Sequence, residues 1–86
     1  MADQSAEHPI DRMTKSISAW AFCDSMVQLD AVRLRSVLAD DAASSGRILT
    51  EIECEAFVCG AENGEVPQAL IDAYPKTHAY LNEFWA

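Results

Sequence analysis

The chain has 86 residues, half of them hydrophobic, and its 14 acidic and 6 basic side chains give a formal net charge of −8. This length corresponds to one domain with a thin core, and the hydrophobic fraction argues against a disordered chain. The negative charge argues against direct binding to nucleic acid and to anionic membrane surfaces, because both repel an acidic protein.

The first eight residues are polar, so we expect a frayed tail over 1–8 and a single helical domain over 9–86. The N-terminus does not resemble a secretory signal, and no apolar run approaches the roughly 18 residues of a membrane span. The cysteines, Cys23, Cys54 and Cys59, are odd in number. We therefore expect free thiols in a reducing, cytoplasmic setting.

The core is expected to form around residues 17–38, a stretch without glycine or proline. Apolar residues recur there every three or four positions, which predicts one face of an α-helix. They are Ile10, Met13, Ile17, Trp20, Cys23, Val27, Ala31, Leu34 and Leu38, with Phe22, Met26, Leu29 and Val37 beside them. Residues 10–43 fit either one helix or two helices divided near Leu29, with Asp30 as N-cap of the second. Typical helix lengths favour the break.

A further helix is expected to begin at Thr50. Gly46 is suited to end the preceding helix in a left-handed conformation. Thr50 and Glu53 match the capping box S/T-x-x-E, in which each side chain bonds the backbone of the other residue. Leu49 is expected to pack against Cys54 as a hydrophobic staple. The helix should end near residue 59, because loop-forming residues follow it.

Two short helices are expected in the C-terminal third. The inward face of the helix that begins at residue 50 is predicted to consist of Ile52, Ala56 and Cys59, with Phe57 and Val58 beside it. Pro67 opens a short helix with Leu70, Ile71 and Tyr74 inward, and Pro75 ends it. A last helix from about Lys76 is expected to bury Tyr80, Leu81, Phe84 and Trp85. The predicted fold class is an all-α bundle of four to five helices without a sheet.

The sequence contains no motif that predicts catalysis, a metal site or a cofactor. A calcium loop starting at Asp41 would place Ile52 at the position that needs a bidentate glutamate. Cys54, Cys59 and His78 lack a fourth ligand and the usual spacing of a zinc site. A DNA-binding helix–turn–helix over 50–74 would lack lysine and arginine. We therefore expect a protein that is not an enzyme.

The strongest candidate site is the acidic region 51–72. Its carboxylates are those of Glu51, Glu53, Glu55, Glu62, Glu65 and Asp72. Carboxylates spread over one helical surface imitate the charge of a phosphate backbone, so we expect them to bind a basic, nucleic-acid-binding surface of a partner protein. The alternative is a structural module that forms a homodimer through the apolar face of residues 17–38.

In size, acidity and helical content, the chain resembles the small phage-encoded inhibitors, anti-CRISPR proteins among them. The resemblance lies in this overall character and not in a motif, and it transfers no site residue. It implies a short acidic domain that blocks nucleic-acid binding by a bacterial machine.

Overall fold

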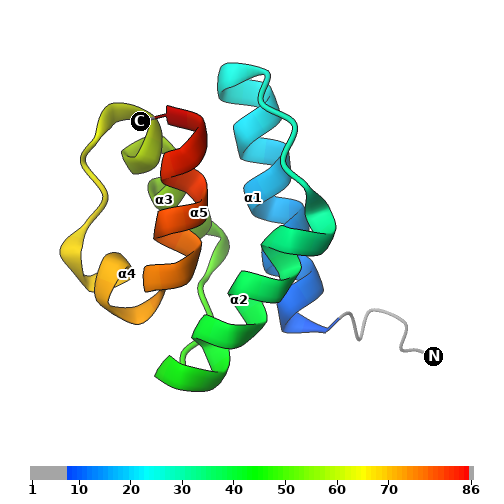
Figure 1. Ribbon diagram of the computed structural model, residues 1–86, viewed down its shortest axis with the longest axis vertical. Helices are drawn as coiled ribbons and strands as arrows, with labels where there is room; N and C mark the ends of the chain where they lie inside the picture. Colours follow the sequence, from blue (N-terminus) through cyan, green and yellow to red (C-terminus); the bar gives the residue numbers. More distant parts are fainter. Residues whose placement is uncertain (1–7, 86) are drawn as a thin grey trace.

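The computed structural model describes residues 8–85, which form five helices and no strand (Figure 1). The helices are α1 (Pro9–Ser25), α2 (Ala31–Ser45), α3 (Glu51–Asn63), α4 (Gln68–Ala73) and α5 (Pro75–Trp85). The predicted all-α bundle is therefore confirmed. The predicted frayed tail lies outside the described residues except for His8. The His8 ring accepts a hydrogen bond from the Ile10 amide at 3.1 Å and caps α1.

The four longer helices form a closed ring of contacts. Helix α1 packs against α2 and α3, and α5 packs against the same two helices (Figure 1). The short α4 contacts α2 and α5. Because α1 and α3 are direct neighbours, side chains far apart in the sequence meet along their contact.

The break between α1 and α2 confirms the two-helix interpretation. Helix α1 ends at Ser25, and Met26 follows in the left-handed conformation with φ 58°. The Asp30 carboxylate accepts hydrogen bonds from the amides of Val32 and Arg33 at 3.0 and 3.2 Å. Asp30 is thus the N-cap of α2, as its side-chain chemistry predicts.

The end of α2 and the start of α3 were also predicted correctly. Gly46 ends α2 with φ 68°, and Thr50 and Glu53 form the complete capping box. The predicted end near residue 59 is wrong, because α3 continues to Asn63 and Gly64 caps it with φ 75°. Gly60 is therefore a helical residue. It leaves space for the following chain, since a Cβ there would lie 2.7 Å from the Val66 Cα atom.

The inward faces differ in part from those predicted. In α3 the buried side chains are Cys54, Phe57, Val58 and Ala61, whereas Ile52 is 78% exposed. The predicted inward position of Ile52 is wrong, because tertiary packing turns α3 toward the side of Phe57. Phe84 of α5 is 40% exposed, which also contradicts the prediction. In the stretch 17–38, Ile17, Ala21, Leu34 and Leu38 are buried, while Phe22, Cys23, Met26 and Ala31 are exposed.

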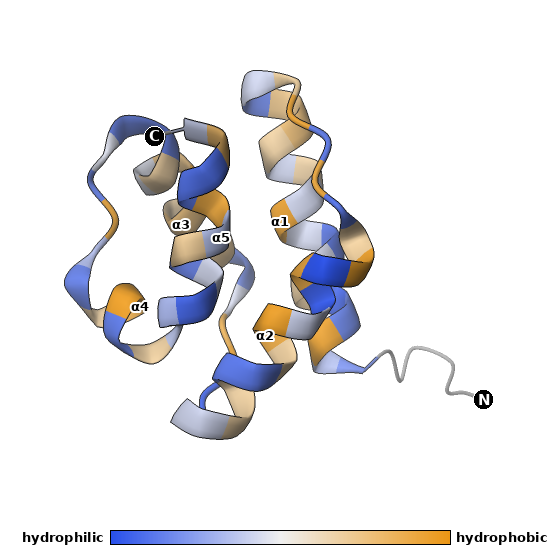
Figure 2. Ribbon diagram, viewed as in Figure 1, coloured by the Kyte–Doolittle hydropathy of each residue, from blue (hydrophilic) through white to orange (hydrophobic). Residues whose placement is uncertain are grey.

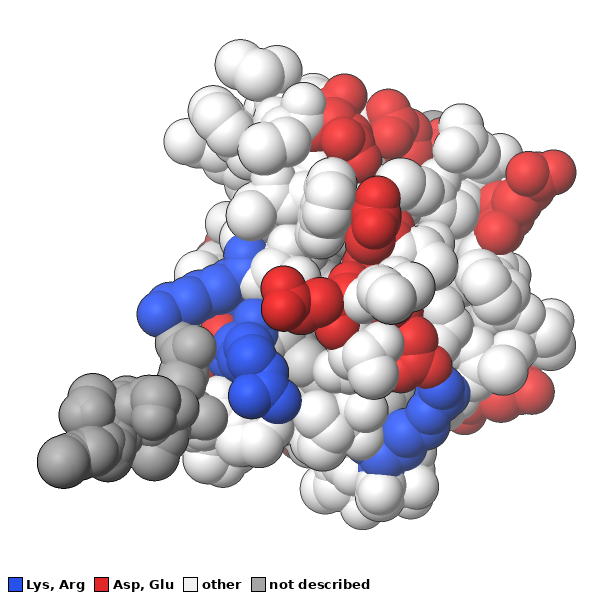
Figure 3. Space-filling view, turned by 180° about the vertical axis from the view of Figure 1, so that it is seen from behind, with Lys and Arg blue, Asp and Glu red and all other residues white. Residues whose placement is uncertain are grey.

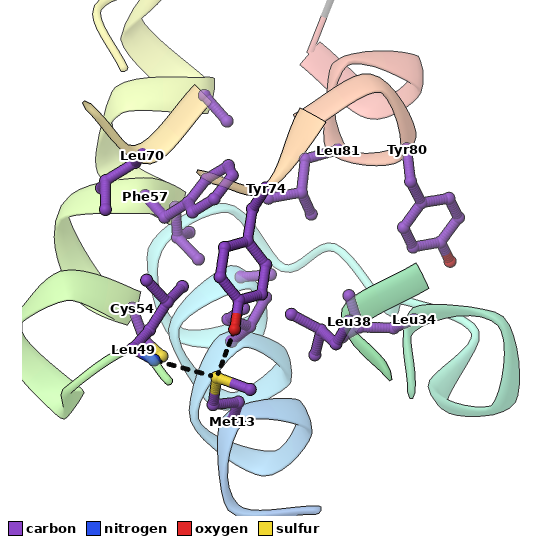
Figure 4. Close-up of a cluster of buried hydrophobic side chains, with 14 of the residues drawn as sticks. Met13, Leu34, Leu38, Leu49, Cys54, Phe57, Leu70, Tyr74, Tyr80 and Leu81 are labelled. Carbon is purple, nitrogen blue, oxygen red and sulfur yellow. Dashed lines mark hydrogen bonds between the residues drawn. The ribbon is translucent and has the colours of Figure 1, made fainter. Parts of the chain in front are cut away.

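Tyr74, between α4 and α5, points into the centre of the core (Figure 4). Its hydroxyl donates a hydrogen bond to the Arg47 carbonyl and lies 3.7 Å from the Met13 sulfur atom. The Leu49 amide also approaches that sulfur atom, at 3.3 Å. Burial of the Tyr74 ring raises the pKa of its hydroxyl to about 12. These contacts join α1, the linker 46–50 and the start of α5.

Candidate functional site

Contact between α1 and α3 brings acidic side chains from both helices together. The Cys59 thiol of α3 donates to the Asp24 carboxylate of α1, with 3.6 Å between sulfur and oxygen. One turn further along α3, the Glu62 carboxylate accepts a hydrogen bond from the Ser25 hydroxyl at 2.5 Å. The end of α1 is thus fixed against the second half of α3, and Asp24 joins the carboxylates of α3.

The Cys59 thiol lies among these carboxylates, about one helical turn from Glu55 and from Glu62 and hydrogen-bonded to Asp24. The pKa of the Cys59 thiol is raised, first by desolvation and then by its hydrogen bond to Asp24. The negative charges of Asp24, Glu55 and Glu62 raise it further, because each disfavours a thiolate nearby. Cys59 therefore marks the centre of a negatively charged surface.

Two more glutamates extend this surface along α3. Glu51 lies one helical turn before Glu55, beside a hollow that it lines with Arg12 and Trp20. Glu65, just after α3, lines a hollow together with Cys59. We call Asp24, Glu51, Glu55, Glu62 and Glu65 the acidic face. Figure 3 shows acidic side chains in a band across the rear of the molecule, with basic side chains at its margins.

The structure brings four of the six predicted site residues onto the acidic face and places two elsewhere. Glu53 forms an ion pair with Arg47 and also accepts a hydrogen bond from the Thr50 amide at 3.0 Å. Asp72 lies on α4 and accepts a hydrogen bond from the Gln68 amide group at 2.8 Å. Glu53 therefore serves the fold, and Asp72 is separate from the carboxylates around Cys59.

The acidic face takes no part in the ion pairs found within residues 8–85. Those pairs are Arg33–Glu83, Arg35–Asp11, Arg47–Glu53 and Lys76–Asp40. Most basic side chains of the described chain are thus engaged away from Asp24, Glu55 and Glu62. These carboxylates are available to cationic groups of another molecule.

The cysteines of α3 are poorly suited to nucleophilic chemistry. Burial raises the pKa of Cys54 to about 11, and the pKa of Cys59 is raised as described above. A thiol with a raised pKa provides little of the reactive thiolate near neutral pH. Among the residues that the structure describes, no three His, Cys, Asp or Glu side chains are placed to hold a metal ion. The arrangement is suited to binding positive charge.

Sequence reasoning missed Asp24 as a site residue. It lies 31 positions before Glu55, in a segment that was assigned to the core, and no local pattern connects the two. Their proximity depends on how α1 packs against α3. The glutamates that alternate at the start of α3 did indicate the acidic face from the sequence. The same pattern also included Glu53, which serves the fold.

Within the described residues, no helix has the length and apolar character needed to cross a membrane. Comparisons with protein-family models, with curated proteins and with solved structures gave no match. The function is therefore inferred from the geometry of the described residues.

Proposed function

We propose that this protein is a non-enzymatic inhibitor or adaptor that binds a basic, nucleic-acid-binding surface of a partner protein through its acidic face. In this proposal it acts as the small acidic phage-encoded inhibitors do, anti-CRISPR proteins among them. The partner is a protein and not nucleic acid, because a chain with a net charge of −8 repels phosphates. The three free thiols are compatible with action in the cytoplasm.

The observation that carries the proposal is the gathering of Asp24, Glu55 and Glu62 around Cys59 without a basic partner among the described residues. These three carboxylates come from two helices and raise the pKa of the same thiol. Binding of a cationic surface would give these carboxylates partners of opposite charge.

The spacing of these carboxylates suits a groove that normally holds nucleic acid. Residues four apart on a helix have Cβ atoms about 5–6 Å from each other, and seven residues rise about 10 Å. Glu51, Glu55 and Glu62 therefore form a line of negative charge along α3. Such a line can replace phosphates against lysine and arginine, and added salt should weaken the contact.

The test is capture of partners from the host on the immobilised protein. A variant with Glu55→Gln and Glu62→Gln removes two charges from the acidic face. A control with Asp11→Asn and Asp40→Asn removes two charges from exposed ion pairs elsewhere. We expect the wild type and the control to retain a basic nucleic-acid-binding protein that is released by 0.5 M salt or by excess duplex DNA or RNA. The acidic-face variant should not retain it.

Equal capture by both variants, or a captured protein that nucleic acid does not displace, would contradict the proposal. Reversal of Glu53 is a poor test, since this residue holds the capping box and the ion pair with Arg47. A loss of binding in such a variant would not separate damage to the fold from damage to the site.

A second candidate function is self-association through the exposed apolar part of residues 17–38. It is favoured by the exposure of Phe22, Met26 and Val32, which are 44%, 72% and 82% exposed. The measurement is light scattering at increasing protein concentration. A constant monomeric mass at millimolar concentration would exclude this function, and a dimer that persists at high salt would support it.

A further inference from the structure

A pocket with a mainly apolar lining lies beside the end of α1, at the connection to α2. It has a volume of about 300 Å³ and is lined by Ser18, Phe22, Val27, Gln28 and Leu29. The connection between α1 and α2 that forms one wall is coloured as strongly hydrophobic at two points in Figure 2. Phe22 is 44% exposed and Met26, at the helix end, is 72% exposed. This volume is at the lower limit of ligand pockets and suits one large apolar side chain.

The end of α5 adds an aromatic side chain at the same end of the bundle (Figure 1). The Tyr80 hydroxyl accepts a hydrogen bond from the Asp30 amide at 2.9 Å, which fixes α5 against the α1–α2 connection. The Phe84 ring packs edge-on against the Tyr80 ring, with 5.3 Å between centroids, and is 40% exposed. Exposed apolar side chains near the α1–α2 connection therefore come from the end of α1 and from the end of α5.

The charges near this end of the bundle are mainly negative. Asp24 lies in the last turn of α1. Glu62 of α3 reaches the same turn and accepts the hydrogen bond from Ser25. Asp30 caps α2, and Glu83 lies beside Phe84 in an ion pair with Arg33. The last turn of α1 has no basic side chain, so the negative end of its helix dipole is not offset locally.

We infer that this pocket receives a large apolar side chain from a basic amphipathic helix of the partner protein. The inference rests on the proposed function and adds to it that the basic partner also provides an apolar anchor. The occupant combines apolar and positive character, since the pocket is apolar and its surroundings are acidic. A second copy of this chain is a poorer occupant, because it would bring two acidic surfaces together.

The test uses two synthetic helical peptides with equal numbers of lysines. One carries leucine on its apolar face, and the other carries alanine at the same positions, which preserves helix propensity. By calorimetry, the wild-type protein should bind the leucine peptide about tenfold more tightly than the alanine peptide. Phe22→Ala should abolish this ratio. The matched control is Ile48→Ala, whose side chain is similarly exposed at 41% but lies in the linker before α3, and it should keep the ratio.

A ratio near one in the wild type, or a full ratio in Phe22→Ala, would overturn the inference. So would a dimer in sedimentation that dissociates in Phe22→Ala, because the pocket would then belong to a second copy. Amide chemical shifts of residues 18–29 in the wild type, changed by the leucine peptide alone, provide support that does not depend on a variant. The double variant Glu55→Gln, Glu62→Gln should weaken both peptides and leave their ratio unchanged. Failure of the proposed function is therefore distinguishable from failure of the anchor.

Discussion

The Asp41 carboxylate of α2 accepts two hydrogen bonds from Thr77 of α5, one from its amide at 2.7 Å and one from its hydroxyl at 2.9 Å. The Lys76 amide approaches the same carboxylate at 3.3 Å. Asp41 is 2% exposed and Thr77 is fully buried. A carboxylate from one helix thus satisfies free amides in the first turn of another, where the helix dipole favours a negative charge.

Replacement of Asp41 should destabilise the fold strongly. Asp41→Ala leaves the buried donors of Thr77 without an acceptor, so we expect a loss of about 2–4 kcal/mol in unfolding free energy. Asp41→Asn keeps one acceptor oxygen and should lose less. The measurement is urea denaturation followed by circular dichroism. Asp40→Ala is the matched control, because its exposed ion pair with Lys76 should contribute less than about 1 kcal/mol. Equal losses in the two alanine variants would contradict this account.

Gly60→Ala should destabilise the protein although alanine favours helices. A Cβ at this position would lie 2.7 Å from the Val66 Cα atom and 2.9 Å from the Glu65 carbonyl oxygen. Because both contacts are with backbone, the chain after α3 has to move, and we expect a loss of about 2 kcal/mol or more against a gain near 1 kcal/mol in propensity. Thermal unfolding measures the difference. A more stable variant would show that the 64–67 connection is free to shift.

Met26→Gly should stabilise the protein. Met26 has φ 58°, and a left-handed residue with a side chain is disfavoured by roughly 1 kcal/mol relative to glycine. The side chain is 72% exposed, so its removal loses little packing. We expect an increase of about 0.5–1 kcal/mol in unfolding free energy, seen as a higher melting temperature. The reverse change at the cap of α2, Gly46→Met, should lower the melting temperature. An unchanged value in both variants would contradict the strain at Met26.

Stability should fall in alkaline solution. The pKa of Cys54 rises from 9.0 to about 11 and that of Tyr74 from 10.0 to about 12, in both cases mainly through burial. The unfolded chain releases these protons at lower pH than the folded chain does. Their stabilisation is therefore complete below about pH 9 and is lost progressively up to about pH 12. Urea denaturation at pH 8 and pH 10.5 measures the loss.

Cys54→Ala provides the comparison for the alkaline effect. This variant lacks the buried thiol, so its unfolding free energy should decrease less between pH 8 and pH 10.5 than that of the wild type. Cys23→Ala removes an exposed thiol instead, and its decrease should equal that of the wild type. Parallel curves for all three proteins would show that Cys54 does not contribute.

Local signals in the sequence predicted the helix starts well. Asp30 and Thr50 carry the side-chain oxygens that satisfy free amides, and this chemistry acts within three residues. The end of α3 was predicted wrongly, because Gly60 was interpreted as a breaker. Its role depends on the approach of Val66, a contact outside any helical pattern. The exposure of Ile52 likewise depends on the direction from which α1 and α5 cover α3.

The candidate site was predicted in part. Glu51 and Glu55 could be placed on one surface from helical spacing, since residues four apart lie about one turn from each other. Glu62 was expected in the loop after residue 59, so its place on α3 did not follow from the sequence. The commitment of Glu53 to Arg47 depends on the path of the linker before α3, and the arrival of Asp24 depends on the packing of α1. Tertiary structure decides both, so neither follows from the local sequence.

The hydrogen bond from Tyr74 to the Arg47 carbonyl has a consequence for recognition. It anchors the linker that leads into α3, and Arg47 in turn pairs with Glu53 in the first turn of that helix. Helix α3 is thereby held in its final orientation before any partner arrives. Docking onto it should require little ordering of the backbone, so the entropic penalty of complex formation should fall mainly on exposed glutamate side chains.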